Sequence, residues 1–273
     1  MGDNKSSIIK PFRICIIGAG PAGLTLALSL VRRVRSGNSR LMISIFERSP
    51  DHRSAATYNP DRSYTIDITG HGLKAARYIG ATNRFDKSLI NFYGIRAPFA
   101  GVEEKCFEPG WTGSRGDICR SLLLELIEAS ETVSSCLNLR FETSAKISNI
   151  FEGIIDIEST GQTVKQESFD LIVGCDGAGS QARRTIQSQL PNFTVSSTEL
   201  SNHSTMLSLD LVKDLDPNYL YVLAPPPVMM VAGAICGPNG KNDPLWFCQV
   251  GRSGSHSYKT PQEARKAVIK CVS

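Results

Sequence analysis

A glycine-rich turn between two apolar segments restricts the fold of this chain more than any other feature. Residues 18–23 read Gly-Ala-Gly-Pro-Ala-Gly. The β-branched run Arg13–Ile17 before the turn is typical of a buried strand, and Pro21–Arg35 after it places apolar residues at helical spacing. Leu41–Phe46 then has the pattern of a second buried strand. Because neighbouring parallel strands need a long crossover between them, this order predicts a strand–helix–strand unit.

Each glycine of the turn has a separate physical role in such a unit. Gly18 permits the tight turn, Gly20 lets the backbone approach a pyrophosphate, and Gly23 lets helix and strand pack closely. The start of the helix, including Ala22, adds free N–H groups and a partial positive charge. Glu47 ends the second strand, where its carboxylate can accept hydrogen bonds from ribose hydroxyls. The pattern predicts a dinucleotide site; the alternative is a ligand-free glycine turn and an exposed Glu.

A second strand-to-turn pattern lies far along the chain. Residues 170–180 read Asp-Leu-Ile-Val-Gly-Cys-Asp-Gly-Ala-Gly-Ser, which places the carboxylate of Asp176 at the end of an apolar run. In an open α/β sheet the carboxyl ends of the strands face the ligand crevice. Arg48, directly after Glu47, suits either a nearby 2′-phosphate or a solvated side chain. The two turns together predict a nucleotide site without choosing the nucleotide.

Segment 170–180 resembles the Asp-Gly motif of the FAD-dependent aromatic hydroxylases, the class A flavoprotein monooxygenases, and is most like the kynurenine 3-monooxygenase family within them. Arg62-Ser63 with the short strand after it, and the stretch His71–Gly80, are similar to that family's region after the first strand–helix–strand unit. Arg120, taken as opening a helix, matches an arginine that the family uses at the flavin. The resemblance covers residues 11–190 and fades beyond them.

The resemblance implies an α/β fold in which a Rossmann-like FAD-binding domain, built on the GxGxxG unit, is interleaved with a mixed β-sheet substrate domain. We expect residues 11–75 and 107–188 to form the FAD-binding domain, and residues 76–106 and 189–273 to form the substrate domain. The family also has a third motif, Gly-Asp followed by small residues, which this chain lacks at the corresponding place. We therefore expect a C-terminally truncated member, without the last part of the FAD-binding domain, whose activity by itself is an open question.

The chemistry that the resemblance implies is carried by cofactors rather than by catalytic side chains. FAD would be reduced by NADPH as co-substrate, O₂ would add at the flavin C4a position, and the hydroperoxide would hydroxylate an aromatic, kynurenine-like small molecule. The alternatives are a flavin-dependent reductase or dehydrogenase of the same fold, and a non-catalytic FAD-binding fragment. The predicted cofactor residues are Gly18, Gly20, Ala22, Gly23, Glu47, Arg48, Arg120, Asp176 and Gly177.

Three of the implied residues also have an ordinary structural interpretation. Arg120 and Asp176 would contact the central part of the flavin; otherwise Arg120 is a solvated residue at a helix start, and Asp176 is a carboxylate that caps a turn. Arg96 would bind the carboxylate of the substrate with its guanidinium fork. Otherwise Arg96 is an exposed strand residue.

Local patterns predict other elements as well. Asp117–Ser130 predicts an amphipathic helix, and Leu137–Phe141, Lys146–Ile150 and Ile154–Glu158 together predict a short β-meander. Strand patterns dominate from Thr205 to Val250.

Composition limits the partners and the setting. The net charge of +4 arises from scattered Lys and Arg rather than a basic stripe, which argues against nucleic acid as a partner. The eight cysteines lack metal-ligand spacing, so we expect no metal and a reducing, cytoplasmic setting. Two apolar stretches, 14–31 and 219–236, are broken by Gly and Pro, so no membrane span is predicted. No histidine has a partner at catalytic spacing; they are His52, His71, His203 and His256.

Overall fold

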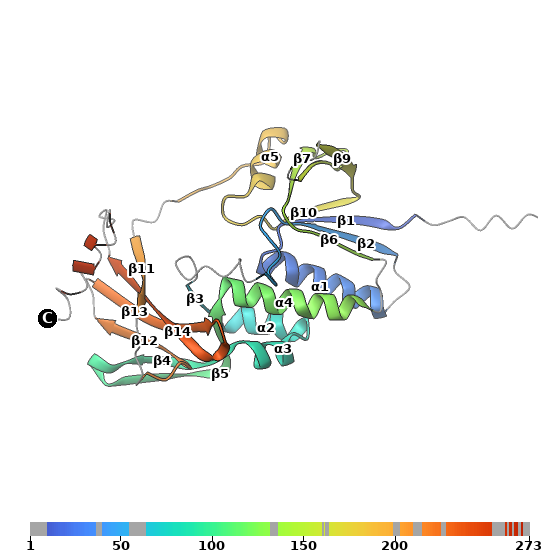
Figure 1. Cartoon of the computed structure of the whole chain (residues 1–273). Coiled ribbons are helices and arrows are strands. Elements are labelled where there is room, and N and C mark those ends of the chain that lie inside the picture. Colours follow the sequence, from blue (N-terminus) through green and yellow to red (C-terminus); the bar gives the residue numbers. More distant parts are fainter. Residues whose placement is uncertain are drawn as a thin grey trace, which may run out of the picture. The chain divides into compact units, whose positions relative to one another are not determined.

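The computed structural model of the chain (Figure 1) divides into two units. The first unit contains Met1–Arg53 and Leu122–Val195, and the second contains Ser54–Ser121 and Ser196–Ser273. The residues that the structure describes are 10–36, 40–54, 64–131, 136–159, 161, 164–198, 203–209, 215–224, 228–252, 260, 262, 263, 265, 266 and 269. Arg62 and Ser63, which contribute to the family resemblance, lie outside them.

The first unit is built on a parallel sheet with the strand order β10-β1-β2-β6. Its strands are β1 (Phe12–Ile17), β2 (Leu41–Phe46), β6 (Leu137–Arg140) and β10 (Leu171–Gly174). Helix α1 (Pro21–Ser36) connects β1 to β2. The predicted strand–helix–strand unit is therefore confirmed. In the register of the sheet, Ile17 pairs with both Phe46 and Gly174, so the carboxyl ends of β1, β2 and β10 meet at one edge.

The predicted β-meander is partly wrong. Leu137–Arg140 forms β6 and pairs in parallel with β2 instead of joining a meander. The antiparallel three-stranded sheet consists of β7 (Thr143–Asn149), β8 (Ile154–Ser159) and β9 (Lys165–Ser168). A short run of four residues contains no information on which sheet it joins, and the partner strand here lies almost 100 positions earlier in the chain. Helix α5 (Gln181–Gln189) follows β10.

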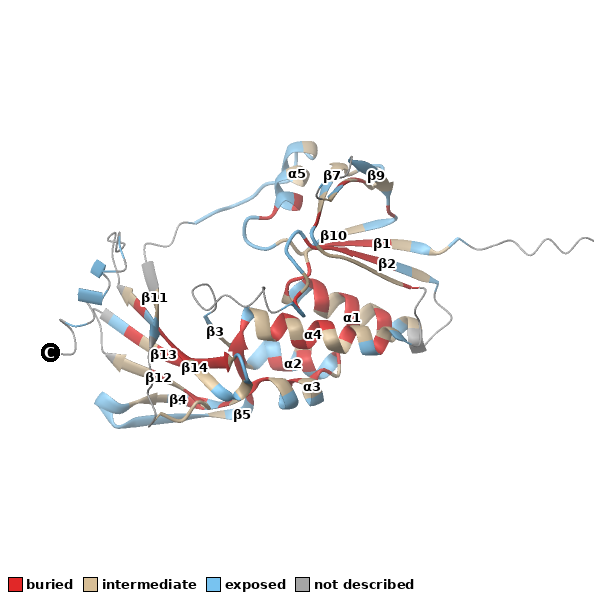
Figure 2. Ribbon diagram, viewed as in Figure 1, coloured by how far each residue is buried: buried red, intermediate tan, exposed pale blue. Residues whose placement is uncertain are grey.

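The central strands of the parallel sheet, β1 and β2, are buried along most of their length, as strands of parallel sheets usually are. Helix α1 packs against β1 and β2 through four side chains that are 0% exposed: Leu24, Ala27, Leu28 and Val31. A separate cluster joins Cys15, Ile17 and Phe46 to residues of the antiparallel sheet and its neighbourhood, namely Ile155, Ile157 and Phe169. Figure 2 shows the buried residues along these helices and strands.

The second unit contains a mixed sheet of seven strands in the order β11-β14-β13-β12-β4-β5-β3. The strands are β3 (Thr65–Ile68), β4 (Ile90–Ala97), β5 (Val102–Ser114), β11 (His203–Leu209), β12 (Tyr219–Ala224), β13 (Val228–Gly237) and β14 (Gly240–Arg252). Strand β12 runs parallel to β4, and the other pairs are antiparallel. Two short helices, α2 (Gly70–Tyr78) and α3 (Thr82–Ser88), connect β3 to β4. The expected α/β fold with a parallel Rossmann-like sheet and a mixed sheet is thus confirmed.

Helix α4 (Arg115–Ser130) begins earlier than the sequence pattern predicts. The Asp117 carboxylate accepts a 2.8 Å hydrogen bond from the backbone N–H of Ser114, and the Ser114 hydroxyl accepts one of 3.1 Å from the N–H of Asp117. This reciprocal capping starts the helix at Arg115. Arg120 therefore lies within the helix, and the prediction that it opens the helix is wrong.

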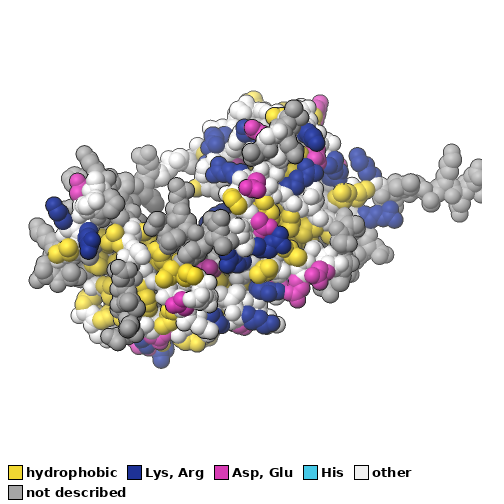
Figure 3. Space-filling view, in the orientation of Figure 1, with side chains coloured by type: hydrophobic (Ala, Val, Ile, Leu, Met, Phe, Trp, Pro, Cys, Tyr) yellow, Lys and Arg dark blue, Asp and Glu magenta, His cyan; other side chains and the backbone are white. Residues whose placement is uncertain are grey.

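The units differ from the domain boundaries expected from the sequence. Residues 54–75 and 107–121 group with the second unit because β3 and β5 pair within the seven-stranded sheet. Which unit binds FAD and which binds a substrate stays a prediction. Lys and Arg side chains are interspersed with Asp and Glu on the face seen in Figure 3. None of the described helices is long and apolar enough to cross a membrane.

Candidate dinucleotide site

The two turns singled out in the sequence lie side by side in the first unit. Strands β1 and β10 are parallel neighbours, so the turns that follow them leave the same edge of the sheet. The backbone N–H of Cys175 donates to the carbonyl of Ile17 at 2.7 Å, and the N–H of Gly18 donates to the carbonyl of Phe46 at 2.8 Å. The beginnings of both turns are thereby fixed to the neighbouring strand ends.

The geometry of the first turn requires glycine at two positions. Gly18 has φ +103°, and a Cβ atom there would lie 2.5 Å from the carbonyl oxygen of Cys175. A Cβ atom on Gly23 would lie 2.0 Å from the carbonyl oxygen of Gly18. Neither distance can be accommodated without moving the backbone, so the second turn packs directly on the first. Gly20 is buried and Ala22 is exposed at the start of α1.

Glu47 binds the first turn through its side chain. One carboxylate oxygen accepts a 2.9 Å hydrogen bond from the backbone N–H of Ala19, and the other accepts a 2.9 Å bond from the N–H of Ser49. The residue is only 9% exposed. Each carboxylate oxygen can accept a second hydrogen bond, so Glu47 keeps acceptor capacity for a ligand hydroxyl. Arg48, next to it, is exposed.

His52 is a site residue that sequence reasoning missed. Its Nε2 atom lies 2.7 Å from the carbonyl oxygen of Ala19 and must donate to it, because a carbonyl only accepts. The ring is buried and packs edge-on against Phe141, with 5.8 Å between the ring centroids. No sequence motif indicates this residue, because it lies in the polar stretch after Glu47 and its hydrogen-bond partner is a backbone atom.

Asp176 caps helix α5 in the second turn. Its carboxylate accepts hydrogen bonds from the hydroxyl of Ser180 and the backbone N–H of Gln181, both at 2.6 Å, and from the N–H of Ala182 at 3.1 Å. Burial alone would raise the pKa of Asp176, but these hydrogen bonds outweigh it and hold the pKa below its ordinary value of 3.8. This is the capping role that we gave as the alternative to flavin contact.

Two arginine side chains of helix α5 bind backbone carbonyl groups of the second turn. Arg183 donates to the carbonyl of Ala178 at 2.6 Å, and Arg184 donates to the carbonyl of Gly179 at 2.8 Å. Gly177 has φ +82°, is exposed, and has open space where a Cβ atom would stand. A rigid turn with an accessible backbone is therefore present directly beside Gly18.

Arg120 and Arg96 belong to the second unit. The Arg96 guanidinium stacks on the ring of Tyr219 at 3.6 Å and donates to Glu103 at 3.0 Å and to the hydroxyl of Tyr221 at 3.3 Å. Asp216 lies 3.9 Å away. The positive charge predicted to bind a substrate carboxylate is thus already paired with carboxylates of the chain.

Comparison with known proteins identifies relatives of the chain. Residues 15–72 match the model of a family described as FAD-NAD(P)-binding. Kynurenine 3-monooxygenase of Salinispora tropica is 25% identical over 178 residues, which are 64% of this chain and 38% of that protein. The enzyme of the same name from Anopheles gambiae is 26% identical over 238 residues, or 82% of this chain and 46% of that protein. Monooxygenase penA of Penicillium thymicola is 31% identical over 182 residues, or 65% and 40%.

Solved structures share the fold. The tetrameric form of 2-methyl-3-hydroxypyridine-5-carboxylic acid oxygenase superposes with a TM-score of 0.67 at 16% identity, covering 96% of this chain and 66% of that one. The flavin-dependent monooxygenase PieE, solved with FAD and substrate, gives a TM-score of 0.63 at 19% identity, covering 96% and 47%. The chain spans less than half the length of the three relatives named above. The resemblance inferred from the two turns is confirmed: the chain is similar in sequence to kynurenine 3-monooxygenases, shares its fold with flavin-dependent monooxygenases, and matches an FAD-NAD(P)-binding family model at residues 15–72.

Proposed function

We propose that the chain acts as the FAD-binding part of an NADPH-driven monooxygenase of a small aromatic substrate. The observation that carries this proposal is the packing of the Gly18 turn on Cys175 at the carboxyl edge of the parallel sheet, with Glu47 beside it. That edge is where open α/β sheets bind nucleotides. FAD, when bound, supplies the redox chemistry by which NADPH and O₂ lead to hydroxylation.

The residues of the first turn fit the ADP half of FAD. Gly18, Gly20 and Gly23 leave the backbone uncovered by side chains, and the first N–H groups of α1, including that of Ala22, suit the pyrophosphate. The remaining acceptor capacity of Glu47 suits ribose hydroxyls. Arg48 is exposed next to this position and would face solvent or a phosphate.

The second turn would contribute to the flavin half. Because its carboxylate caps α5, we propose that Asp176 acts as a positioning residue that fixes the backbone at Gly177. The open space at Gly177 would let a ligand approach that backbone. Arg120 stays a proposed flavin contact on the family resemblance alone.

The substrate would be an aromatic small molecule, and a kynurenine-like one is the finer form of this proposal. Arg96 could bind its carboxylate only by exchanging the contact with Glu103 or Asp216. The chain's task would be to position the ring and to exclude water. We also propose a reducing, cytoplasmic setting, because the cysteines among the described residues are free thiols.

The test begins with the visible absorption spectrum of the purified chain with and without added FAD. A bound flavin spectrum, followed by NADPH oxidation stimulated by an aromatic compound and by ¹⁸O transfer from O₂ to product, would support the proposal. Oxidation coupled to an artificial acceptor without oxygen transfer would favour a reductase or dehydrogenase. Bound FAD without NADPH oxidation would favour a non-catalytic fragment, and failure to bind FAD would refute the proposal for this chain.

A further inference from the structure

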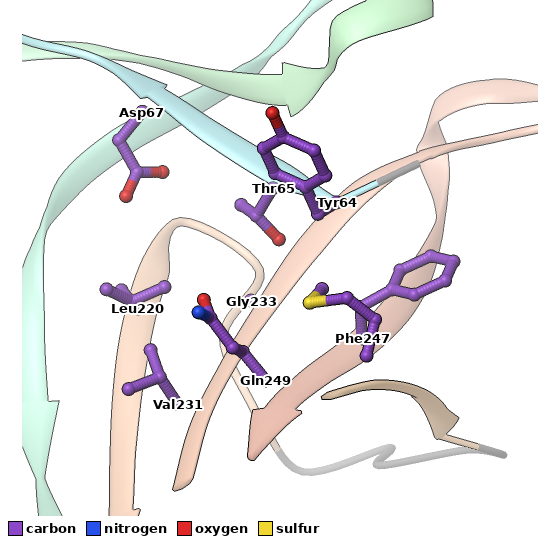
Figure 4. A pocket seen from close by; sticks show the side chains of 9 residues that line it. Tyr64, Thr65, Asp67, Leu220, Val231, Gly233, Phe247 and Gln249 are labelled. Atoms are coloured by element: carbon purple, nitrogen blue, oxygen red, sulfur yellow. The ribbon is translucent and has the colours of Figure 1, made fainter. Parts of the chain in front are cut away.

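A small pocket lies within the second unit, between β3 at one end of the seven-stranded sheet and strands β11 to β14 of the same sheet (Figure 4). Its volume is about 130 Å³. A cavity of about 150 Å³ can hold benzene, so this pocket is the size of a single aromatic ring. The lining residues are Tyr64, Thr65, Asp67, Met206, Leu220, Val231, Gly233, Phe247 and Gln249.

The lining of the pocket is mixed: Met206, Leu220, Val231 and Phe247 are apolar, whereas Tyr64, Thr65, Asp67 and Gln249 carry polar groups. Phe247 is 3% exposed, and Leu220 and Val231 are half-buried on the neighbouring strands. Gly233 lies where β3 comes close to β13: a Cβ atom there would stand 2.9 Å from the Thr65 hydroxyl and 3.1 Å from Leu220. The absence of a side chain at Gly233 is therefore what lets β3 lie this close to β13.

Asp67 brings a carboxylate into this mixed lining. Figure 4 shows its carboxylate extending from β3 toward the strands that carry Leu220 and Val231. The Oδ1 atom is buried and forms no hydrogen bond of standard geometry. The same holds for the hydroxyl of Thr112, the cross-strand neighbour of Asp67 on β5, although this side chain lies near enough to lower the pKa of the Asp67 carboxyl. No ion pair among the described residues includes Asp67. Buried polar atoms without partners are rare in folded proteins, and each needs an explanation.

The pKa of Asp67 is consistent with this environment. Burial raises the pKa, and the nearby Thr112 side chain offsets only part of the increase. The carboxylate would regain full stabilisation from a ligand that brings a positive charge or an N–H donor into the pocket. A neutral apolar ligand would leave Oδ1 unpaired, and an anionic ligand would be repelled.

We propose that this pocket binds a compact aromatic ligand bearing a protonated nitrogen, with the nitrogen paired to Asp67 and the ring against Phe247 and Leu220. Asp67 is then the residue that determines ligand specificity. As an assignment of substrate class, the inference rests on the proposed function, but binding itself requires neither FAD nor turnover.

The test is calorimetric titration of the full chain, at neutral pH, with three probes of one ring size: benzylamine, benzyl alcohol and benzoate. We expect benzylamine to bind at least tenfold more tightly than benzyl alcohol, and benzoate not to bind. Asp67→Asn keeps the shape of the side chain and should abolish the preference for benzylamine. Glu104→Gln removes an exposed carboxylate on β5 outside the pocket and should leave all three affinities unchanged.

The remaining outcomes are decisive as well. Failure of benzylamine to bind, equal binding of benzyl alcohol, or an unchanged preference in Asp67→Asn would each overturn the inference. Gly233→Val, which places side-chain atoms against Thr65, should abolish binding of benzylamine if the ligand occupies this pocket. If benzylamine binds but FAD does not, the proposed function fails and the ligand proposed for the pocket stands. If FAD-dependent turnover occurs but benzylamine does not bind, the ligand proposed for the pocket fails and the proposed function stands.

Discussion

His52 donates a 2.7 Å hydrogen bond to the carbonyl of Ala19 from a buried position. Glu47 accepts a 2.9 Å hydrogen bond from the backbone N–H of the same Ala19. One residue of the glycine turn is therefore bound on both of its polar backbone groups by side chains that follow β2. This arrangement fixes the direction in which the turn presents its backbone at the edge of the parallel sheet.

The His52 contact predicts a loss of stability on removal. His52→Phe keeps a ring against Phe141 but leaves the Ala19 carbonyl without its donor, which should cost about 1–3 kcal/mol of unfolding free energy. FAD affinity should fall with it, measured by quenching of flavin fluorescence. The matched control is His71→Phe, because His71 is exposed on α2. Equal effects of the two changes would contradict the role given to His52.

Glu47→Gln should weaken FAD binding by about tenfold or more, since hydrogen bonds to a charged group contribute about 1.5–3 kcal/mol. The N–H groups of Ala19 and Ser49 donate to different oxygens of Glu47, and glutamine replaces one of these oxygens by an NH₂ group that cannot accept. The measurement is a fluorescence titration of FAD. Glu152→Gln, in an exposed turn of the same unit, should bind FAD as the unchanged chain does.

Gly18→Ala and Gly177→Ala separate steric clash from backbone strain. Both positions have positive φ, but only at Gly18 would the new methyl group meet backbone atoms, 2.5 Å from the Cys175 carbonyl. We expect Gly177→Ala to cost about 1–2 kcal/mol for the strained conformation. Gly18→Ala should cost about 3 kcal/mol or more, or prevent folding of the first unit. Thermal unfolding followed by far-ultraviolet circular dichroism measures both, and comparable losses would refute the packing of the two turns.

Asp176→Asn should destabilise the chain in a pH-dependent way. The hydrogen bonds that lower the pKa of Asp176 below 3.8 stabilise the fold above that pH, and this contribution is lost as the pH falls through the lowered pKa. Replacement of a capping carboxylate costs about 0.5–2 kcal/mol near neutral pH. Urea unfolding of both chains, from neutral pH to below pH 3.8, should show a steady difference that shrinks only below that pH. A difference independent of pH would rule out the ionised cap.

Asp67→Asn should have the opposite pH dependence. The pKa of Asp67 is raised above 3.8, so its contribution to stability is full below that pH and is lost as the pH rises through the raised pKa. The Asn variant, which cannot ionise, should therefore become more stable than the unchanged chain as the pH rises toward neutral. Tryptophan fluorescence during urea unfolding measures this, because Trp111 and Trp246 both belong to the second unit. A variant that is less stable than the unchanged chain at neutral pH would contradict the burial of a charged Asp67.

Local sequence patterns predicted the elements that carry the candidate site. The glycine turn, the strand before it and the helix after it lie within about two dozen residues, and β2 has the bounds that its apolar run predicts. The turn at Asp176 was found in the same way, because the apolar run that became β10 leads directly into it. In each case hydrophobic periodicity and glycine chemistry act between near neighbours in the chain, so a sequence pattern is sufficient.

Only the tertiary structure decided the contacts between distant segments. The sequence pattern of Leu137–Arg140 is compatible with the parallel sheet and with the antiparallel three-stranded sheet, and only the pairing with β2 places it in the parallel sheet. The contact of His52 with a backbone carbonyl leaves no side-chain pattern to read. Asp67 meets Leu220 and Gly233 only because β3 lies close to strands formed more than 150 residues later. The sequence alone determined the strand–helix–strand unit and the resemblance that it carries. Burial, which depends on what packs from elsewhere in the chain, decided which charges are paired and which are left without a partner.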